Sequence, residues 1–131
     1  MESQKYLALA AVIALVVAII MGVTFSGARG AGNDPGAAVY NKKCLSCHPI
    51  KEGAHKLGPS LASMFGRKAG TVAGYTKYRG LIGSDIIWNE HNLDGFLENP
   101  KKFLGKRTTM VYKLKNAEER ELVIEYMKTI K

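Results

Sequence analysis

Two cysteines and a histidine lie close together in the segment NKKCLSCHPI, residues 41–50. Cys44 and Cys47 are the only cysteines of the 131-residue chain, and His48 follows them directly. Cysteine and histidine side chains bind metals, thiol pairs exchange electrons through disulfides, and a C-x-x-C-H run attaches haem covalently. We therefore test this spacing against these three kinds of chemistry.

Zinc and thiol redox chemistry fit the surrounding sequence poorly. A structural zinc site usually takes four ligands in two pairs, and the chain has no second cysteine pair; His55 and His91 lack zinc-finger spacing. A thioredoxin-like pair calls for a β-α-β pattern, which the flanking residues do not show. A structural disulfide across one helical turn rarely reaches acceptable geometry. The remaining interpretation is a covalently attached haem, with Cys44 and Cys47 bonded to its vinyl groups and His48 to its iron.

The second axial position of such a haem has five candidates: Met64, Met110, Met127, His55 and His91. Met127 lies in a segment with helical hydrophobic spacing, which predicts a core residue. Met64 lies shortly after the attachment motif, and we interpret it as pocket or core packing. Met110 lies in GKRTTMVYK, a stretch without helical periodicity between two helical segments. This loop is the place from which a long side chain could be directed across a cofactor.

The N-terminal part of the chain predicts a membrane segment. Leu7 to Phe25 holds 19 uncharged residues, enough for a helix to cross the hydrocarbon layer. We therefore expect residues 1–25 to form an N-terminal transmembrane helix that serves as a membrane anchor or an uncleaved signal. The alternative is a signal peptide that is cleaved at the small residues 26–28. Residues 26–34 are expected to be a flexible linker, and residues 35–131 the folded domain. A short N-terminal tail usually stays cytoplasmic, so the predicted location is the cell inner membrane with the haem domain on the periplasmic side.

Charge and composition narrow the function. From residue 31 onward the chain has 17 Lys plus Arg against 10 Asp plus Glu. A basic rim around a haem edge would attract partners with acidic docking surfaces, and nucleic-acid binding suits an exported haem domain poorly. Neither paired carboxylates in a plausible pocket nor a nucleophile with a base is evident, so we do not expect an enzyme. The basic residues that flank the expected haem segments are Lys42, Lys43, Lys56, Lys101, Lys102, Lys106, Arg107, Lys113 and Lys115.

Helix signals predict a mainly α domain. Asp34 and Pro35 look like an N-cap and first helical position, and the helix should run to Lys43. Further helices are expected over 89–98, after the Asn-Pro pair at 99–100, and after a capping box of Asn116 and Glu119. The acidic residues of this last helix could make the molecule dipolar. The glycine-containing segment 53–83 is expected to form compact loops.

At this level of detail the chain resembles the class I cytochromes c, especially the mitochondrial and alphaproteobacterial type, over nearly all of residues 35–131. The resemblance is carried by an ordered series of motifs: CLSCH, HKLGP at 55–59, FGRKAG at 65–70, Trp88, LENPKKF at 97–103, Met110, and EEREL with YMK near the C-terminus. It implies an all-α, class I cytochrome c fold, in which short helices and loops surround one covalent haem c. It also implies that Gly36 and Tyr40 of the first helix cross Leu122 and Tyr126 of the last.

The resemblance also implies roles for single residues. His48 and Met110 would be the axial iron ligands, the Pro59 carbonyl would hold the His48 ring, and Arg67 and Trp88 would lie near the haem propionates. Both axial positions would then be filled, which leaves electron transfer as the function rather than catalysis. The implied partners are membrane complexes: a quinol:cytochrome c reductase and a terminal oxidase or reaction centre. The alternatives are a haem subunit of a larger oxidoreductase, or a soluble carrier released by cleavage.

Two departures from the family pattern bear on these roles. Phe96 stands where the family has a tyrosine that can hydrogen-bond the methionine sulfur, so we expect that bond to be absent. The loop before Met110 lacks the usual proline and is one residue longer, which predicts a more labile loop. The match is weak between Gly74 and Trp88, and no propionate contact is assigned to Tyr75 or Tyr78.

Overall fold

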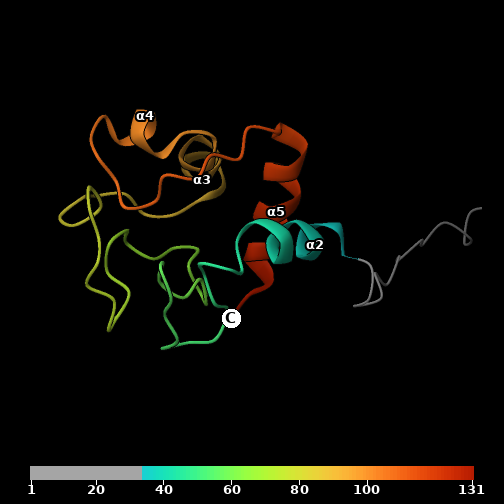
Figure 1. Ribbon diagram of the computed structural model, residues 1–131, viewed down its shortest axis with the longest axis horizontal. Coiled ribbons are helices and arrows are strands. Elements are labelled where there is room, and N and C mark those ends of the chain that lie inside the picture. Colours follow the sequence, from blue (N-terminus) through green and yellow to red (C-terminus); the bar gives the residue numbers. More distant parts are fainter. Residues whose placement is uncertain (1–33) are drawn as a thin grey trace, which may run out of the picture.

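The computed structural model describes residues 34–131, which form helices joined by long loops (Figure 1). No extended strand occurs in this range, where a single bridge pairs Lys68 with Ile87. The helical class expected from the sequence is therefore confirmed for the folded domain. Its helices are α2 (Pro35–Lys43), α3 (Glu90–Glu98), α4 (Pro100–Leu104) and α5 (Ala117–Thr129).

Side-chain caps explain where the first and last helices begin. Asp34 Oδ1 accepts hydrogen bonds from the backbone N–H groups of Gly36 (2.8 Å) and Ala37 (3.3 Å), and Pro35 occupies the first helical position. Asn116 Oδ1 accepts the Glu119 N–H at 3.0 Å. Both predicted helix starts are confirmed, although the Glu119 side chain does not complete a capping box.

The two middle helices are capped by asparagines. Asn89 and Asn92 form a reciprocal capping box at the start of α3, each side chain accepting the other's N–H at 3.0 Å. Asn99 ends α3 and caps α4, where Pro100 is the first residue. The short α4 ends at Gly105 in the left-handed region, with a φ of 64°. These caps fix the direction in which the chain leaves α4 toward Met110.

Helices α2 and α5 cross on one side of the domain (Figure 1). A Cβ at Gly36 would clash with the Leu122 carbonyl and the Tyr126 side chain, so glycine permits the close approach. The rings of Tyr40 and Tyr126 lie 5.4 Å apart. The crossing predicted for these four residues is confirmed.

The buried core lies between this helix pair and α3. Tyr40, Val123 and Met127 are at most 2% exposed, and Leu93, Phe96 and Leu97 of α3 are also buried. The chain between α2 and α3 forms the other side of the domain as loops (Figure 1). One face of the core is therefore walled by loops, and the candidate site lies there.

The predicted transmembrane helix of residues 1–25 and most of the predicted linker, residues 26–33, lie outside the described residues. Within residues 34–131, no helix has the length and apolar character needed to cross a membrane.

Candidate haem site

A cavity of about 630 Å³ lies between the loops and the helical core. Its walls are mainly apolar and include side chains from every helix except α4. Its size falls in the range of small-molecule and cofactor pockets, about 300 to 1,000 Å³. The structure brings all the site residues expected from the sequence to this one cavity: Cys44, Cys47, His48, Pro59, Arg67, Trp88 and Met110.

The C-x-x-C-H segment forms a tight turn directly after α2. The backbone N–H groups of Cys47 (3.0 Å) and His48 (2.8 Å) both donate to the Cys44 carbonyl. Neither cysteine forms a disulfide. Burial, followed by the nearby Cys47, raises the pKa of the Cys44 thiol to about 11. This thiol therefore keeps its proton at neutral pH.

The His48 ring is fixed by its surroundings. Its Nδ1 lies 2.9 Å from the Pro59 carbonyl oxygen, and because a carbonyl only accepts, Nδ1 carries the proton. Burial lowers the pKa of His48, and the Pro59 hydrogen bond opposes this in part. The ring is therefore held neutral with Nε2 deprotonated, the state in which an imidazole binds a metal.

Gly58 and Tyr40 support the same histidine from two sides. A Cβ at Gly58 would clash with the His48 ring, and the Gly58 N–H donates to the Cys47 carbonyl at 2.9 Å. The buried Tyr40 hydroxyl donates to the His48 carbonyl at 2.6 Å. Burial raises the pKa of Tyr40, so this hydroxyl stays a donor. The HKLGP loop and α2 together position the imidazole.

The histidines and methionines considered for the opposite axial position differ in where they lie relative to the cavity. His55 does not line the cavity: its Nε2 lies 2.9 Å from the Ala73 carbonyl oxygen, and its Nδ1 accepts the Ser60 N–H at 3.2 Å. His91 lies exposed on α3, away from the cavity. The three methionines all line it, but Met64 and Met127 are packed in the core at 6% and 2% exposure. Met110 is half-buried in the loop after α4, so it is the methionine least committed to core packing.

Arg67 and Trp88 lie at one wall of the cavity and are linked through the backbone. The Trp88 N–H donates to the Arg67 carbonyl at 3.0 Å, and Arg67 Nη2 donates to the Ala62 carbonyl at 2.7 Å. Within residues 34–131, Arg67 forms no ion pair. A half-buried guanidinium without a carboxylate suits an acidic group of a bound cofactor.

Two tyrosines of the cavity wall were not predicted from the sequence. Tyr75 and Tyr78 line it, with ring centroids 4.8 Å apart, and the Tyr75 hydroxyl donates to the Leu57 carbonyl at 2.5 Å. Burial raises the pKa of Tyr78; the hydrogen bond that its hydroxyl accepts from the Val72 N–H and, to a smaller extent, the nearby Arg67 oppose this in part. Both tyrosines lie in a loop without hydrophobic periodicity. The one sequence signal that could have suggested them as cavity residues is their aromatic character in a polar, glycine-rich segment.

The cavity near α3 is apolar. Phe96 is 5% exposed and its ring packs against those of Trp88 (5.0 Å) and Phe103 (6.0 Å). It therefore brings no hydroxyl to the cavity, in agreement with the expectation for this position.

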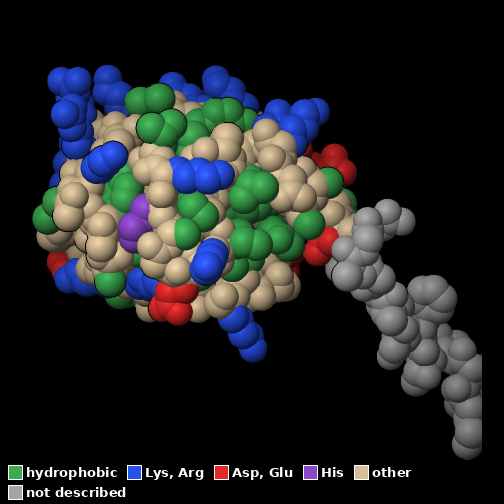
Figure 2. All heavy atoms as spheres, turned by 60° about the horizontal axis from the view of Figure 1, so that its bottom comes forward, with side chains coloured by type: hydrophobic (Ala, Val, Ile, Leu, Met, Phe, Trp, Pro, Cys, Tyr) green, Lys and Arg blue, Asp and Glu red, His purple; other side chains and the backbone are tan. Residues whose placement is uncertain are grey.

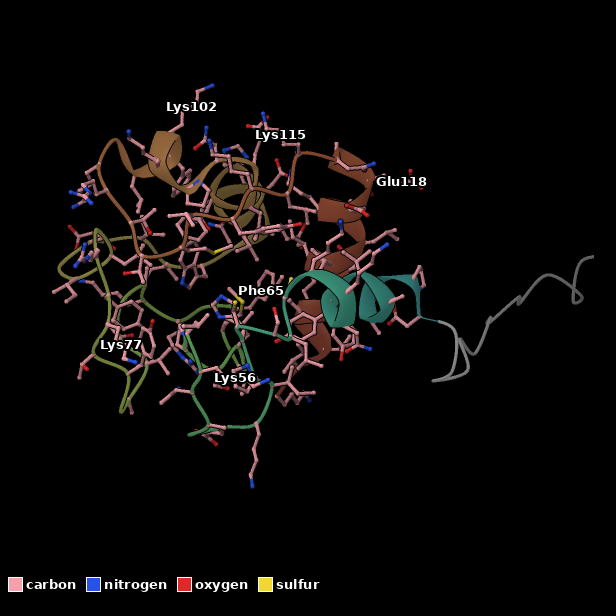
Figure 3. The ribbon with its side chains drawn as sticks, viewed as in Figure 1. Lys56, Phe65, Lys77, Lys102, Lys115 and Glu118 are labelled. Atoms are coloured by element: carbon pink, nitrogen blue, oxygen red, sulfur yellow. The ribbon has the colours of Figure 1, made fainter. Side chains whose placement is uncertain are left out.

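Basic side chains surround the cavity unevenly. Lys42 and Lys43 line it, as predicted, together with Arg67, Lys68 and Arg79. Lys102 points outward from α4 (Figure 3). The other seven predicted flanking residues do not line the cavity: Lys56, Lys101, Lys102, Lys106, Arg107, Lys113 and Lys115. Figure 2 shows many Lys and Arg side chains along one edge of the face that it presents, with single ones also among the apolar and neutral side chains of its middle. Glu118 lies at the opposite end of the domain from Lys77 (Figure 3).

Comparison with known proteins agrees with this geometry. The family model for cytochrome c matches residues 34–131. The chain belongs to the cytochrome c family. It is 38% identical over 106 residues to a cytochrome c of Ginkgo biloba, covering 80% of this chain and 94% of that protein. It is 39% identical over 88 residues to cytochrome c2 iso-2 of Magnetospirillum molischianum, covering 67% and 91% of the two chains. The structure of ferricytochrome c2 from Rhodopseudomonas palustris superposes with a TM-score of 0.65 at 34% identity, covering 74% of this chain and 96% of that one.

This cytochrome c is an electron-transfer protein, and its family binds one covalent haem c through the cysteine pair, here Cys44 and Cys47. The haem, when bound, supplies an iron that accepts and releases one electron. The residues present fit it: two thiols and a neutral imidazole lie at the wall of one apolar cavity, beside Arg67, which has no carboxylate partner among residues 34–131. These residues fasten and orient the cofactor, and the apolar walls exclude water from it.

Proposed function

We propose that this cytochrome c is a membrane-anchored carrier that moves single electrons between a quinol:cytochrome c reductase and a terminal oxidase or photosynthetic reaction centre. Residues 7–25 would hold it in the lipid bilayer of the cell inner membrane, with the haem domain on the periplasmic side. The observation that carries the anchor is the run of 19 uncharged residues, which lies entirely before the family match beginning at residue 34.

The proposed axial ligands of the iron are His48 and Met110. His48 is supported by its neutral, oriented ring, and Met110 by its place in a loop that lines the cavity. With both positions filled, neither oxygen nor a substrate reaches the metal, which favours electron transfer without catalysis.

Contacts with partners are proposed to form where the cofactor cavity meets the surface. Lys42 and Lys43 line the cavity, and the exposed side chains of Leu57 (72%) and Val111 (80%) lie at it too. A small apolar patch with basic residues around it suits brief complexes with acidic surfaces. Their association rates should fall steeply with added salt.

The anchor is tested on membranes from cells that produce the full chain. Haem staining after a carbonate wash should find the protein in the membrane fraction, and intact mass should include residues 1–33. A matched chain lacking residues 7–25 but carrying a cleavable export signal should be found in the wash. A mass that begins after residue 28 would show that the protein is a released carrier.

Electron transfer is tested with the purified full-length protein in detergent. Isolated reductase should reduce it, and isolated oxidase should oxidise it again, with rates that fall as ionic strength rises. Absence of reduction by the quinol-oxidising complex would contradict the proposed position between these complexes. It would favour instead a haem subunit of another oxidoreductase.

A further inference from the structure

The described chain enters the domain at the end where α2 begins beside α5 (Figure 1). Asp34 caps α2, and a Cβ at Gly36, in its first turn, would clash with the Leu122 carbonyl of α5. Glu118 lies about one helical turn before Leu122, at this same end of the domain (Figure 3). Residues that precede Asp34 therefore join the domain here, at what we call the entry end.

The entry end carries negative charge. Three glutamates of α5 form no ion pair within residues 34–131: Glu118, Glu119 and Glu121. Figure 2 shows acidic side chains at the right end of the domain, which is the entry end in Figure 1 as well. The charge at the place where the chain enters is thus opposite to the excess positive charge of the whole protein.

The opposite end, which we call the far end, carries positive charge. Lys77 lies there (Figure 3), and Thr109 Oγ1 donates to its carbonyl at 2.7 Å, which brings in the loop that holds Lys106 and Arg107. None of these three cations forms an ion pair within residues 34–131. Figure 2 shows a group of Lys and Arg side chains at this end.

The length of the connection limits where the far end can go. The proposed anchor ends at Phe25, so residues 26–33 connect it to the domain. At no more than about 3.5 Å per residue this segment spans at most about 28 Å, and about 6 Å of that is needed to cross the headgroup layer. A compact domain of about 100 residues has a radius of gyration of about 13 Å and is therefore about 33 Å across. Even with the segment fully extended, the far end stays roughly 10 Å from the headgroups.

This distance matters because charge attraction to lipid has a short range. Anionic headgroups attract a nearby Lys or Arg by about 1 kcal/mol each, but the attraction falls off within a Debye length, about 8 Å at physiological salt. The connection therefore keeps Lys77 and Arg107 out of this range. The same headgroups repel the unpaired glutamates of the entry end, so that end does not bind the lipid either.

We propose that the short connection withholds the far end from the lipid of the protein's own membrane and leaves it free to bind an acidic protein surface that approaches from the aqueous side. This inference rests on the anchor proposed above. An untethered domain with the same charges could turn its far end to anionic lipid, because nothing would limit its rotation. The partner that fits is a redox protein whose acidic docking surface stands roughly 10 Å or more above the headgroups.

The test uses the haem-loaded full chain in lipid nanodiscs, with a spin label on one new cysteine. Lys77→Cys places the label at the far end, and Glu118→Cys is the matched position at the entry end. Nickel-chelating lipids relax labels that lie near the headgroups, and the diamagnetic ferrous state prevents relaxation by the iron. The label at residue 118 should be relaxed and the label at residue 77 should not, in zwitterionic discs and equally in discs rich in phosphatidylglycerol.

A longer connection should remove the restriction. Insertion of about twenty Gly and Ser residues between Arg29 and Gly30 extends the reach to roughly 90 Å. In anionic discs this variant should bring the label at residue 77 to the headgroups, and about 0.5 M salt, which shortens the Debye length to about 4 Å, should reverse that. A glutamate oligopeptide, used as the probe of the far end, should bind this variant more weakly in anionic than in zwitterionic discs. It should bind the native-length chain equally in both.

Two results would overturn the proposal while leaving the anchor intact. The first is relaxation of the label at residue 77, or weaker binding of the peptide, when the native-length chain is moved from zwitterionic to anionic discs. The second is a far end that stays away from anionic lipid even with the longer connection, which would mean that the connection is not what withholds it. Release of the native-length chain from the discs by high salt would instead contradict the anchor itself, and the inference would be lost with it.

Discussion

His48 Nδ1 lies 2.9 Å from the Pro59 carbonyl oxygen, and Gly58 lies against the face of the same ring. The HKLGP loop thus holds the imidazole by one hydrogen bond and one close contact. The loop is itself tied to the attachment turn, because the Gly58 N–H donates to the Cys47 carbonyl at 2.9 Å. The HKLGP motif therefore positions one side chain, the imidazole of His48.

Gly58→Ala should displace the His48 ring, because the new Cβ would overlap its atoms. We expect a loss of about 1 to 3 kcal/mol in the free energy of unfolding, in the range of overpacked cores, and a changed Soret band. Gly53→Ala is the control, since a Cβ at Gly53 meets nothing within 4 Å and its cost is limited to backbone strain at a φ of 70°. A Soret band as unperturbed in Gly58→Ala as in Gly53→Ala would contradict this role of Gly58.

The assignment of Met110 is tested by leucine, which conserves volume but lacks sulfur. Met110→Leu should abolish the sulfur-to-iron charge-transfer band of the ferric protein, lower the reduction potential and let the ferrous iron bind carbon monoxide. Met64→Leu and Met127→Leu are matched controls, because both residues line the same cavity. They should keep the band and lose less than about 1.5 kcal/mol of stability. If the band survives in Met110→Leu and disappears in one of the others, the ligand is wrongly assigned.

Helix positions were predictable from the sequence because their signals are local. Asp34 and Asn116 accept N–H groups within three residues along the chain, and the pairing of Gly36 with Tyr126 follows from the family resemblance. The contact between the loop 76–79 and the loop before Met110 had no such signal. It is made by Thr109 and Lys77, which are 32 residues apart and lie in loops without periodicity. Only the folded chain brings them together.

The loop residues of the haem cavity were predictable only where a motif marked them. Pro59 and Arg67 belong to family motifs, and both line the cavity. Tyr75 and Tyr78 lie where the match is weak, and their positions depend on contacts with Leu57 and Val72 that sequence spacing does not reveal. The seven predicted residues thus belong to family motifs or, like Trp88 and Met110, stand at single positions that match the family, and the added ones depend on tertiary packing.

The hydrogen bond from Tyr40 to the His48 carbonyl predicts a pH-dependent stability. Removing the hydroxyl in Tyr40→Phe leaves a carbonyl without its partner and should cost about 1 to 3 kcal/mol at pH 7. Burial raises the pKa of Tyr40 above its ordinary value of 10.0, so the folded state favours the protonated form. This contribution is fully present below pH 10 and is lost as the pH rises further. Denaturant unfolding from pH 7 to 11 should therefore show the difference between parent and Tyr40→Phe shrinking above pH 10.

Tyr126→Phe is the control for this measurement. Tyr126 packs on Tyr40 at 5.4 Å but no hydrogen bond from its hydroxyl is found within residues 34–131. Its replacement should change stability by less than about 0.5 kcal/mol. A similar loss in both variants would mean that ring packing, and not the hydroxyl, accounts for the effect.

Arg120 connects α5 to the segment that follows Met110. Its Nε donates to Asp94 on α3 at 2.6 Å, and its Nη1 donates to the carbonyls of Leu114 (3.0 Å) and Lys115 (2.9 Å). Arg120 is 7% exposed, so Arg120→Met would leave the buried Leu114 carbonyl and the partly buried Lys115 carbonyl without this donor and should cost about 3 kcal/mol. Asp94→Asn should cost about 1 kcal/mol or less, because the Asp94 side chain is 49% exposed. Equal losses would show that the ion pair, rather than the carbonyl contacts, carries the effect.

Removal of the haem should unfold the tertiary structure. A cavity of about 630 Å³ with mainly apolar walls would then be open to water, and the exposed apolar surface destabilises the folded state. The Cys44→Ala/Cys47→Ala double variant, produced without haem attachment, should therefore lose its near-ultraviolet circular dichroism and exchange its α3 amides rapidly. Helices α2 and α5 bury Val123 and Tyr40 at their own crossing, so some far-ultraviolet helical signal should remain. A cooperative thermal transition with native near-ultraviolet signal in this variant would show that the polypeptide completes its core without the cofactor.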